Sequence, residues 1–115
     1  MRIVDPDHAI TMDELRKMAE AMFGDLVKAV VDVHRETMAV DAELHSDEEA
    51  RLLEDGSEQE DLWGINLYPA LQEADFVEFD SMINLRPARG NRGPGVEDAA
   101  IRERILAIVH RLVSQ

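Results

Sequence analysis

The sequence predicts an α+β domain: a four-stranded, mainly antiparallel sheet made of two hairpins, with about three helices packed on one face. Apolar and polar residues alternate with a period of two in four segments, as in strands that bury one face. In three other segments apolar residues recur every three or four positions, as in amphipathic helices. No linker or shift of composition divides the chain, so one domain is expected to span residues 1–115.

The first helix is predicted to begin at Thr11. Thr11 followed by Glu14 is a capping box, in which each side chain satisfies a backbone N–H of the first helical turn. Gly24 suits the left-handed residue that closes many helices, so the helix is expected to end there. The apolar residues at helical spacing are Leu15, Met18, Ala19 and Met22.

A hairpin is predicted over residues 27–44, where the period changes to two. If Arg35 and Glu36 form a two-residue loop, residues whose numbers sum to 71 are cross-strand partners and share a face. One face is then apolar, and Lys28 meets Glu43 on the polar face. Arg-Glu is an unfavourable pair for a tight turn, which leaves a longer or bulged turn open. The apolar pairs are Val33/Met38, Val31/Val40, Ala29/Ala42 and Val27/Leu44.

Four elements complete the predicted fold. Ser46 and Glu49 form a second capping box, which indicates a short helix that Gly56 can end. Two further segments of period two predict the third and fourth strands, and a last amphipathic segment predicts the final helix. The expected spans of these strands and this helix are residues 62–68, 76–85 and 96–113.

The composition argues against several classes of function. Asp and Glu number 25 against 12 Lys and Arg, a net charge of −13, which disfavours general binding to DNA, RNA or anionic membranes. The absence of cysteine excludes disulfides, thiolate metal sites and a cysteine nucleophile. No segment resembles a signal peptide or a membrane span, so a cytoplasmic protein is expected, and no motif requires a cofactor.

The first candidate site is the polar face of the predicted sheet. Glu43 and His45 are two residues apart on one predicted strand and therefore point in the same direction. A carboxylate beside an imidazole suits an acid–base pair or a divalent metal ion. Asn66, on the polar side of the third strand, is expected to bind ligand there. The alternatives are a solvated sheet face and a face covered by a second subunit in a homodimer.

The second candidate site is the loop that follows the fourth strand, where three arginines occur among glycines in an otherwise acidic chain. Guanidinium groups bind carboxylate and phosphate with two parallel hydrogen bonds, and glycine lets backbone N–H groups approach a ligand. Arg86, Arg89 and Arg92 are therefore expected to hold an anion that Asn84 and Asn91 orient. The alternative is that these arginines pair with carboxylates of the protein itself.

Several motifs together resemble a known family. The sequence is similar, from about residue 10 to its end, to small prokaryotic proteins grouped as domain-of-unknown-function family 5674. The resemblance implies no activity, ligand or cofactor. It does draw attention to polar residues that folding alone does not obviously require, namely His45, Asn66, Asn84, Arg86, Asn91 and Arg92. The motifs that carry it are Glu43-Leu44-His45, Leu-Leu-Glu-Asp-Gly-Ser at residues 52–57, residues 59–69, Asn84-x-Arg86-Pro87 and Gly90-Asn91-Arg92.

These observations lead to three hypotheses. The first is a domain that binds a small phosphate- or carboxylate-bearing ligand through the loop at residues 86–92. The second is a metal-assisted hydrolase or acid–base enzyme that uses Glu43 and His45. The third is an acidic domain that binds another protein. A site in which His45, Asn84 and Arg86 converge would favour a ligand binder or an enzyme over a solvated surface.

Overall fold

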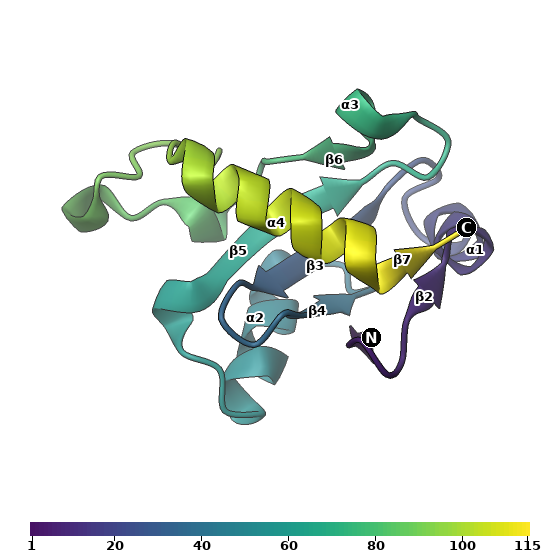
Figure 1. Ribbon diagram of the computed structural model, residues 1–115, viewed down its shortest axis with the longest axis horizontal. Helices are drawn as coiled ribbons and strands as arrows, with labels where there is room; N and C mark the ends of the chain where they lie inside the picture. The colour runs from purple at the N-terminus through teal and green to yellow at the C-terminus, as the bar shows by residue number, and fades with distance from the viewer.

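The computed structural model describes all residues, 1–115, and contains a five-stranded antiparallel sheet flanked by helices (Figure 1). The strand order is β1-β4-β3-β5-β6. The predicted α+β class with an antiparallel sheet is confirmed, whereas the predicted number of strands is wrong because β1 adds an edge strand beside β4. The strands are β1 (Arg2–Val4), β3 (Val27–Asp32), β4 (Thr37–Val40), β5 (Leu62–Leu67) and β6 (Val77–Glu78).

Four helices, three 3-10 turns and a small second sheet complete the structure. The second sheet is parallel and joins the segment before the first helix to the C-terminal end of the chain. Its strands are β2 (Ile10–Thr11) and β7 (Val113–Ser114). The helices are α1 (Met12–Ala21), α2 (His45–Glu54), α3 (Glu73–Phe76) and α4 (Ala99–Leu112). The 3-10 turns are η1 (Gln59–Asp61), η2 (Met82–Asn84) and η3 (Pro87–Arg89).

The two predicted capping boxes have different outcomes. Thr11 Oγ1 accepts the Glu14 N–H at 3.0 Å, and Glu14 Oε1 accepts the Thr11 N–H at 3.1 Å, so the first is confirmed. The second is wrong, because α2 begins two residues earlier than expected and Leu44, not Ser46, occupies its N-cap, without a side-chain hydrogen bond. The final helix has Asp98 as its N-cap, and Asp98 Oδ1 accepts the Ala100 N–H at 2.8 Å.

The hairpin has a longer loop than the two residues tested from the sequence. Asp32 pairs with Thr37, so four residues form the loop and the predicted register is shifted by two. The buried Asp32 carboxylate causes this, because its Oδ1 accepts the N–H groups of His34 and Arg35, each at 2.9 Å. A shift of two residues preserves which side chains share a face. The predicted apolar face is therefore retained over β3 and β4, although its individual pairs change. Ala42 and Leu44, which were expected on this face, follow the end of β4 and are not part of the main core, and Leu44 is exposed.

The second strand of the hairpin ends earlier than predicted. Asp41 has a left-handed φ of 69°, which stops β4 at Val40. The Asp41 N–H donates to the Lys28 carbonyl at 3.4 Å, so Asp41 and not Glu43 lies opposite Lys28. The predicted pairing of Lys28 with Glu43 is wrong. The placement of Glu43 and His45 on one strand is wrong as well, because β4 ends at Val40 and His45 begins α2.

Both faces of the sheet are covered, which corrects the prediction that the helices pack on one face. The main core lies between the sheet and the helices α1 and α4, and Figure 1 shows α4 crossing the front of the sheet. On the opposite face α2 and η2 cover a second, smaller core. Leu52 of α2 packs there against the strands, and Ile83 of η2 packs at its border. The buried residues of this second core are Val30, Ala39, Leu52 and Leu62.

The predicted strand over residues 76–85 is interrupted. Only Val77 and Glu78 pair with β5, after which the chain turns over the second face as η2. Gly64 permits this approach, since a Cβ atom at that position would lie 2.5 Å from the Ser81 Cβ. Asn84 consequently leaves the sheet and lies in η2, not on a strand as expected.

Candidate functional site

The loop at residues 84–97 is held against the sheet by the side chain of Asn84. Its Oδ1 accepts the Gly64 N–H at 2.8 Å, and its Nδ2 donates to the Gly64 carbonyl at 2.9 Å. Nδ2 also donates to the Pro94 carbonyl at 2.8 Å. Asn84 is fully buried, so its amide takes the place of a neighbouring strand where β6 has ended.

Asn91 organises the same loop from within. Its Nδ2 lies 2.7 Å from the Asn84 carbonyl and 2.8 Å from that of Gly95, with the Gly93 carbonyl at 3.1 Å. Its Oδ1 accepts the Glu97 N–H at 2.8 Å. These bonds satisfy a backbone that is not part of a regular element. Asn91 therefore fixes the loop's shape, and its amide has no group left for a ligand.

Arg86 lies along the edge of the sheet. Its guanidinium carbon is 4.4 Å from the ring centre of Trp63, which is a cation–π arrangement. Nη1 donates to the Glu60 carbonyl at 3.3 Å, and Nη2 donates to the Leu62 carbonyl. Partial burial lowers the pKa of Arg86. Through these two carbonyl bonds Arg86 joins η1 and β5 to the loop. It forms no salt bridge with a carboxylate of the protein.

Arg89 and Arg92 extend from the same loop with fewer contacts. Arg89 Nη1 lies 3.5 Å from Glu60 Oε2, and 55% of the Arg89 side chain is exposed. Arg92 is exposed and forms a hydrogen bond through its backbone N–H, which donates to Glu97 Oε2 at 3.1 Å. The guanidinium groups available to a ligand are therefore those of Arg89 and Arg92.

A surface hollow of about 530 Å³ lies between η1 and this loop. We call it the arginine hollow. It combines two guanidinium groups, two carboxylates and an apolar wall, and its volume is in the range of small-molecule sites. The lining residues are Glu58, Gln59, Glu60, Ile83, Leu85, Arg86, Ala88 and Arg89.

His45 and Asn66 come together elsewhere on the second face. His45 Nε2 donates to the Ile65 carbonyl at 2.8 Å, which fixes the proton on Nε2 and leaves Nδ1 as an acceptor in the neutral ring. Burial lowers the pKa of His45, and the charge of Lys28 lowers it further, although Ile65, Asp80 and Asn66 act in the opposite direction. The imidazole is therefore held in its neutral form at neutral pH.

Asn66 is 7% exposed and is bonded on one side only. Its Nδ2 donates to Glu78 Oε1 at 2.8 Å and to the Asp80 carbonyl at 3.3 Å. Its Oδ1 is buried and has no hydrogen-bond partner. Lys28 is the direct cross-strand partner of Asn66. Lys28, His45 and Asn66 thus form a polar cluster at the end of the second face.

The structure does not bring the other predicted catalytic residue into this cluster. Glu43 is exposed in the connection between β4 and α2 and makes no side-chain hydrogen bond. No group of three or more His, Asp or Glu side chains is placed to hold a metal ion. His45, Asn84 and Arg86 all bond to the backbone of β5, but through different groups, and of the three only Arg86 lines the arginine hollow.

Sequence reasoning missed Glu48, which has the most perturbed pKa that the structure resolves. Glu48 belongs to α2, and its side chain is fully buried on the inner side of this helix. Burial raises its pKa to about 9. One oxygen accepts the Ala42 N–H at 3.1 Å, and the other has no partner. Glu48 is three residues after His45 and four before Leu52, and this helical spacing to buried positions is the signal that identifies it.

These features define a small α+β protein whose antiparallel sheet is covered on both faces and whose polar motif residues bond to backbone groups of the fold. The chain belongs to the family described as protein of unknown function (DUF5674), whose model matches residues 3–112. No curated protein and no solved structure matches the chain. No helix has both the length and the apolar composition needed to cross a membrane.

Proposed function

We propose that the protein is a binding domain for a small ligand with one carboxylate or phosphate group, which occupies the arginine hollow. The observation that carries this proposal is the exposed Arg89 guanidinium at the side of a hollow of about 530 Å³. Its present partner, Glu60, is 3.5 Å away and exposed, and such surface ion pairs contribute little energy. A ligand anion that forms two parallel hydrogen bonds with Arg89 would displace Glu60.

The two arginines of the hollow have different roles in this proposal. Arg86 is occupied by Trp63 and by two backbone carbonyls, so it shapes the wall. Arg89 binds the anion. Arg92 is exposed in the same loop but does not line the hollow, and it adds to the local positive charge that attracts an anion to a protein of net charge −13.

The rest of the lining limits the kind of ligand. Ile83, Leu85 and Ala88 offer an apolar wall, which favours a ligand with an apolar body. Glu58 and Glu60 line the hollow too, and their charges disfavour a compact polyanion. A ligand with an apolar body and a single carboxylate or phosphate group fits this lining better than inorganic phosphate does, because inorganic phosphate cannot use the apolar wall.

A thermal-shift and calorimetric comparison tests the proposal. The probes are benzoate, phenyl phosphate and inorganic phosphate. We expect the first two to raise Tm and inorganic phosphate to have a smaller effect, and we expect Arg89→Ala to abolish the shifts. Arg16→Ala is the matched control, because Arg16 is exposed on α1 and forms no hydrogen bond or salt bridge. The proposal fails if the organic probes do not bind, or if the two variants respond alike.

A second candidate function is acid–base chemistry at Lys28, His45 and Asn66. The observation that favours it is the His45 ring itself, whose Nε2–H is bonded to the Ile65 carbonyl and whose Nδ1 is left to act as a base. The test is hydrolysis of p-nitrophenyl acetate by the wild-type protein and by His45→Gln. Turnover that the substitution removes supports the idea, and equal rates for both proteins contradict it.

A further inference from the structure

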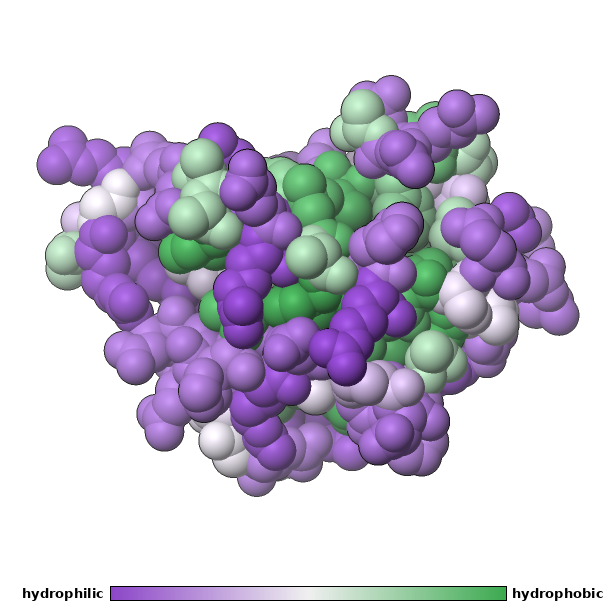
Figure 2. Space-filling view, viewed as in Figure 1, coloured by the Kyte–Doolittle hydropathy of each residue, from purple (hydrophilic) through white to green (hydrophobic).

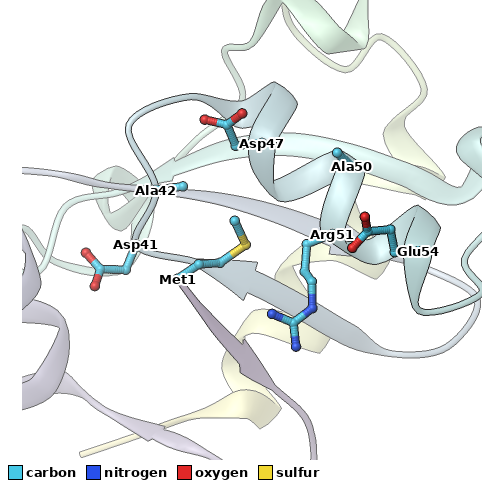
Figure 3. A pocket seen from close by; sticks show the side chains of 7 residues that line it. All are labelled: Met1, Asp41, Ala42, Asp47, Ala50, Arg51 and Glu54. Atoms are coloured by element: carbon cyan, nitrogen blue, oxygen red, sulfur yellow. The ribbon is translucent and has the colours of Figure 1, made fainter.

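A second hollow, of about 510 Å³, lies between α2 and the segment that follows β4 (Figure 3). Carboxylates and one guanidinium line it, and Figure 3 shows the Met1 side chain extending toward the middle. Every charged side chain of this lining is exposed or partly exposed, so water satisfies its hydrogen bonds. Nothing in this hollow therefore requires a ligand.

Asn66 differs from these residues, because one of its side-chain atoms is buried without a partner. Asn66 belongs to a row across the second face, in which Lys28 on β3 and Glu78 on β6 are its direct cross-strand partners. Cross-strand partners of this kind share a face of the sheet. Asn66 is 7% exposed, and its Oδ1 has no hydrogen-bond partner. A buried amide oxygen in this state has lost its hydrogen bonds to water and gained none in return.

The contacts of the Asn66 amide fix the direction in which this oxygen points. Nδ2 donates to Glu78 Oε1 at 2.8 Å and to the Asp80 carbonyl at 3.3 Å, so the nitrogen lies on the β6 side. The opposite assignment would place the amide oxygen against two acceptor oxygens. Oδ1 therefore lies on the other side, toward Lys28 and the His45 ring. In agreement with this direction, the Asn66 side chain is among the groups that raise the pKa of His45.

Two further groups beside this oxygen have unused hydrogen-bonding capacity. His45 Nδ1 is an acceptor without a partner, since Nε2 carries the proton that bonds the Ile65 carbonyl. The Lys28 ammonium forms no salt bridge and lies 5.0 Å from the centre of the exposed Phe23 ring. The end of the second face thus offers two acceptors, one of them buried, and one cationic donor.

This combination selects one kind of ligand group. A carboxylate or a fully ionised phosphate has no hydrogen to give to the two acceptors. An ammonium ion has the hydrogens but is repelled by Lys28. A hydroxyl group has only one hydrogen. A primary carboxamide has two N–H groups on one nitrogen for the two acceptors and a carbonyl oxygen for the cationic donor.

We propose that Lys28, His45 and Asn66 bind the primary carboxamide group of a small organic molecule. The proposal rests on the second candidate function for its site and names the class of ligand that occupies it. The two amide hydrogens go to Asn66 Oδ1 and His45 Nδ1, and the amide oxygen accepts a hydrogen bond from Lys28. Lys28 is partly exposed and is held by its contact with Phe23, so its long side chain moves aside to admit the ligand. The exposed Phe23 ring then offers a surface to an apolar ligand body.

A ¹H–¹⁵N NMR titration of the wild-type protein with three probes counts the amide hydrogens that the site uses. Benzamide has two, N-methylbenzamide has one and N,N-dimethylbenzamide has none. We expect saturable shifts at the amides of residues 28, 45 and 66 with benzamide and none with N,N-dimethylbenzamide. Loss of one hydrogen bond should make the affinity for N-methylbenzamide roughly tenfold lower. A parallel titration with acetyl-Ala-Gln-Ala-N-methylamide compares a free amide with a glutamine side chain, and the tighter probe identifies the source of the group.

Two variants test the role of Asn66. Asn66→Ala removes the buried acceptor, so we expect the affinity for benzamide to fall roughly tenfold. Gln72→Ala is the matched control for loss of one side-chain amide, because Gln72 is exposed and its side chain caps no helix, and it should bind as wild type does. The probe series uses the wild-type protein, so the test holds even if Asn66→Ala does not fold. Absence of binding by both benzamide and the peptide, equal affinities for benzamide and N,N-dimethylbenzamide, or equal effects of the two substitutions would each overturn the proposal.

The same titrations separate this proposal from the two candidate functions. Benzamide is uncharged, so we expect Arg89→Ala to bind it as the wild-type protein does, whether or not the arginine hollow binds an anion. Benzamide binding without turnover of p-nitrophenyl acetate would support the ligand class and reject the catalysis. Turnover without binding of benzamide or the peptide would support the catalysis and reject the ligand class.

Discussion

The side-chain amide of Asn84 bonds both backbone groups of Gly64, at 2.8 Å and 2.9 Å, and so completes a sheet edge that no strand covers. Arg86 extends this contact by donating to the Leu62 carbonyl. Asn84 and Arg86, which looked like ligand-binding residues in the sequence, thus seal the exposed edge of β5. An open edge of this kind is a site of unwanted strand pairing. The same contacts position the arginine hollow, since Arg86 lines it.

Replacement of Asn84 tests this edge contact. Asn84→Ala leaves the buried Gly64 N–H and two carbonyls without partners, so we expect a loss of roughly 3 kcal/mol in the free energy of unfolding, measured with urea. Ser46→Ala is the control, because Ser46 is exposed and caps no helix, and its effect should stay within about 0.5 kcal/mol. Equal losses for the two variants would contradict the role assigned to Asn84.

Gly64 should not tolerate a side chain. A Cβ atom there would lie 2.5 Å from the Ser81 Cβ, so Gly64→Ala is expected to destabilise the protein by roughly 2 kcal/mol through overpacking. Gly93→Ala, where a Cβ atom meets no other atom within 4 Å, should have little effect. Combining Gly64→Ala with Ser81→Gly should recover part of the loss. Thermal unfolding measures all three, and no recovery in the double variant would show that the contact with Ser81 is not the cause.

Glu48 should make the protein less stable as pH rises. Its pKa is about 9 when folded against an ordinary 4.5, so between these values the folded chain holds a proton that the unfolded chain has lost. Stability therefore falls from pH 4.5 toward pH 9, by about 3 kcal/mol at pH 7 at 1.36 kcal/mol per pH unit. Glu48→Gln should remove this slope and raise stability at neutral pH. Urea unfolding between pH 5 and 9 is the measurement, and parallel pH profiles for the two proteins would refute the assignment.

Arg86 should resist conservative replacement. Arg86→Lys keeps the charge but loses the planar contact with Trp63 and one of the two carbonyl bonds, so a loss of about 1–2 kcal/mol is expected. The fluorescence of Trp63, the single tryptophan, should change with it. Arg89→Lys, in an exposed side chain, should leave both stability and fluorescence unchanged. If Arg86→Lys also leaves them unchanged, the stacking contact does not contribute to the fold.

The local signals of the fold could be predicted from sequence, because they depend on neighbouring residues. The capping box of Thr11 and Glu14 and the apolar face of the hairpin are examples. The hairpin register could not, because it depends on the buried Asp32 carboxylate, which also accepts a bond of 2.6 Å from Ser57 Oγ, far away in the chain. The packing of α2 and η2 on the second face was not predicted. The reason is that this face carries Lys28 and Asp32, and such charged residues usually indicate a face exposed to solvent.

The candidate site could be predicted only in part. His45 and Asn66 were expected on one polar face and do lie together, because His45 bonds the carbonyl of Ile65, the neighbour of Asn66 in β5. Glu43 was grouped with His45 on the assumption that β4 continued, and the left-handed backbone at Asp41 ends that strand. Glu48 lies in a run of acidic residues, and its helical spacing to His45 and Leu52 indicates burial only once the inner face of α2 is known.

Figure 2 shows that hydrophilic residues cover most of the face turned toward the viewer, with hydrophobic residues visible across its centre. The net charge of −13 attracts cations broadly, so binding of a cation says little about any particular site. Binding of an anion runs against the net charge of −13 and is therefore a more selective test of the protein.

The most direct test of the central claim is a ¹H–¹⁵N NMR titration with phenyl phosphate. Binding in the arginine hollow predicts saturable shifts confined to the amides of residues 58–60 and 83–90, and their loss in Arg89→Ala. Shifts that remain in Arg89→Ala, or that centre on Lys28 and His45, would contradict the proposed site. No saturable shift at all would contradict the function.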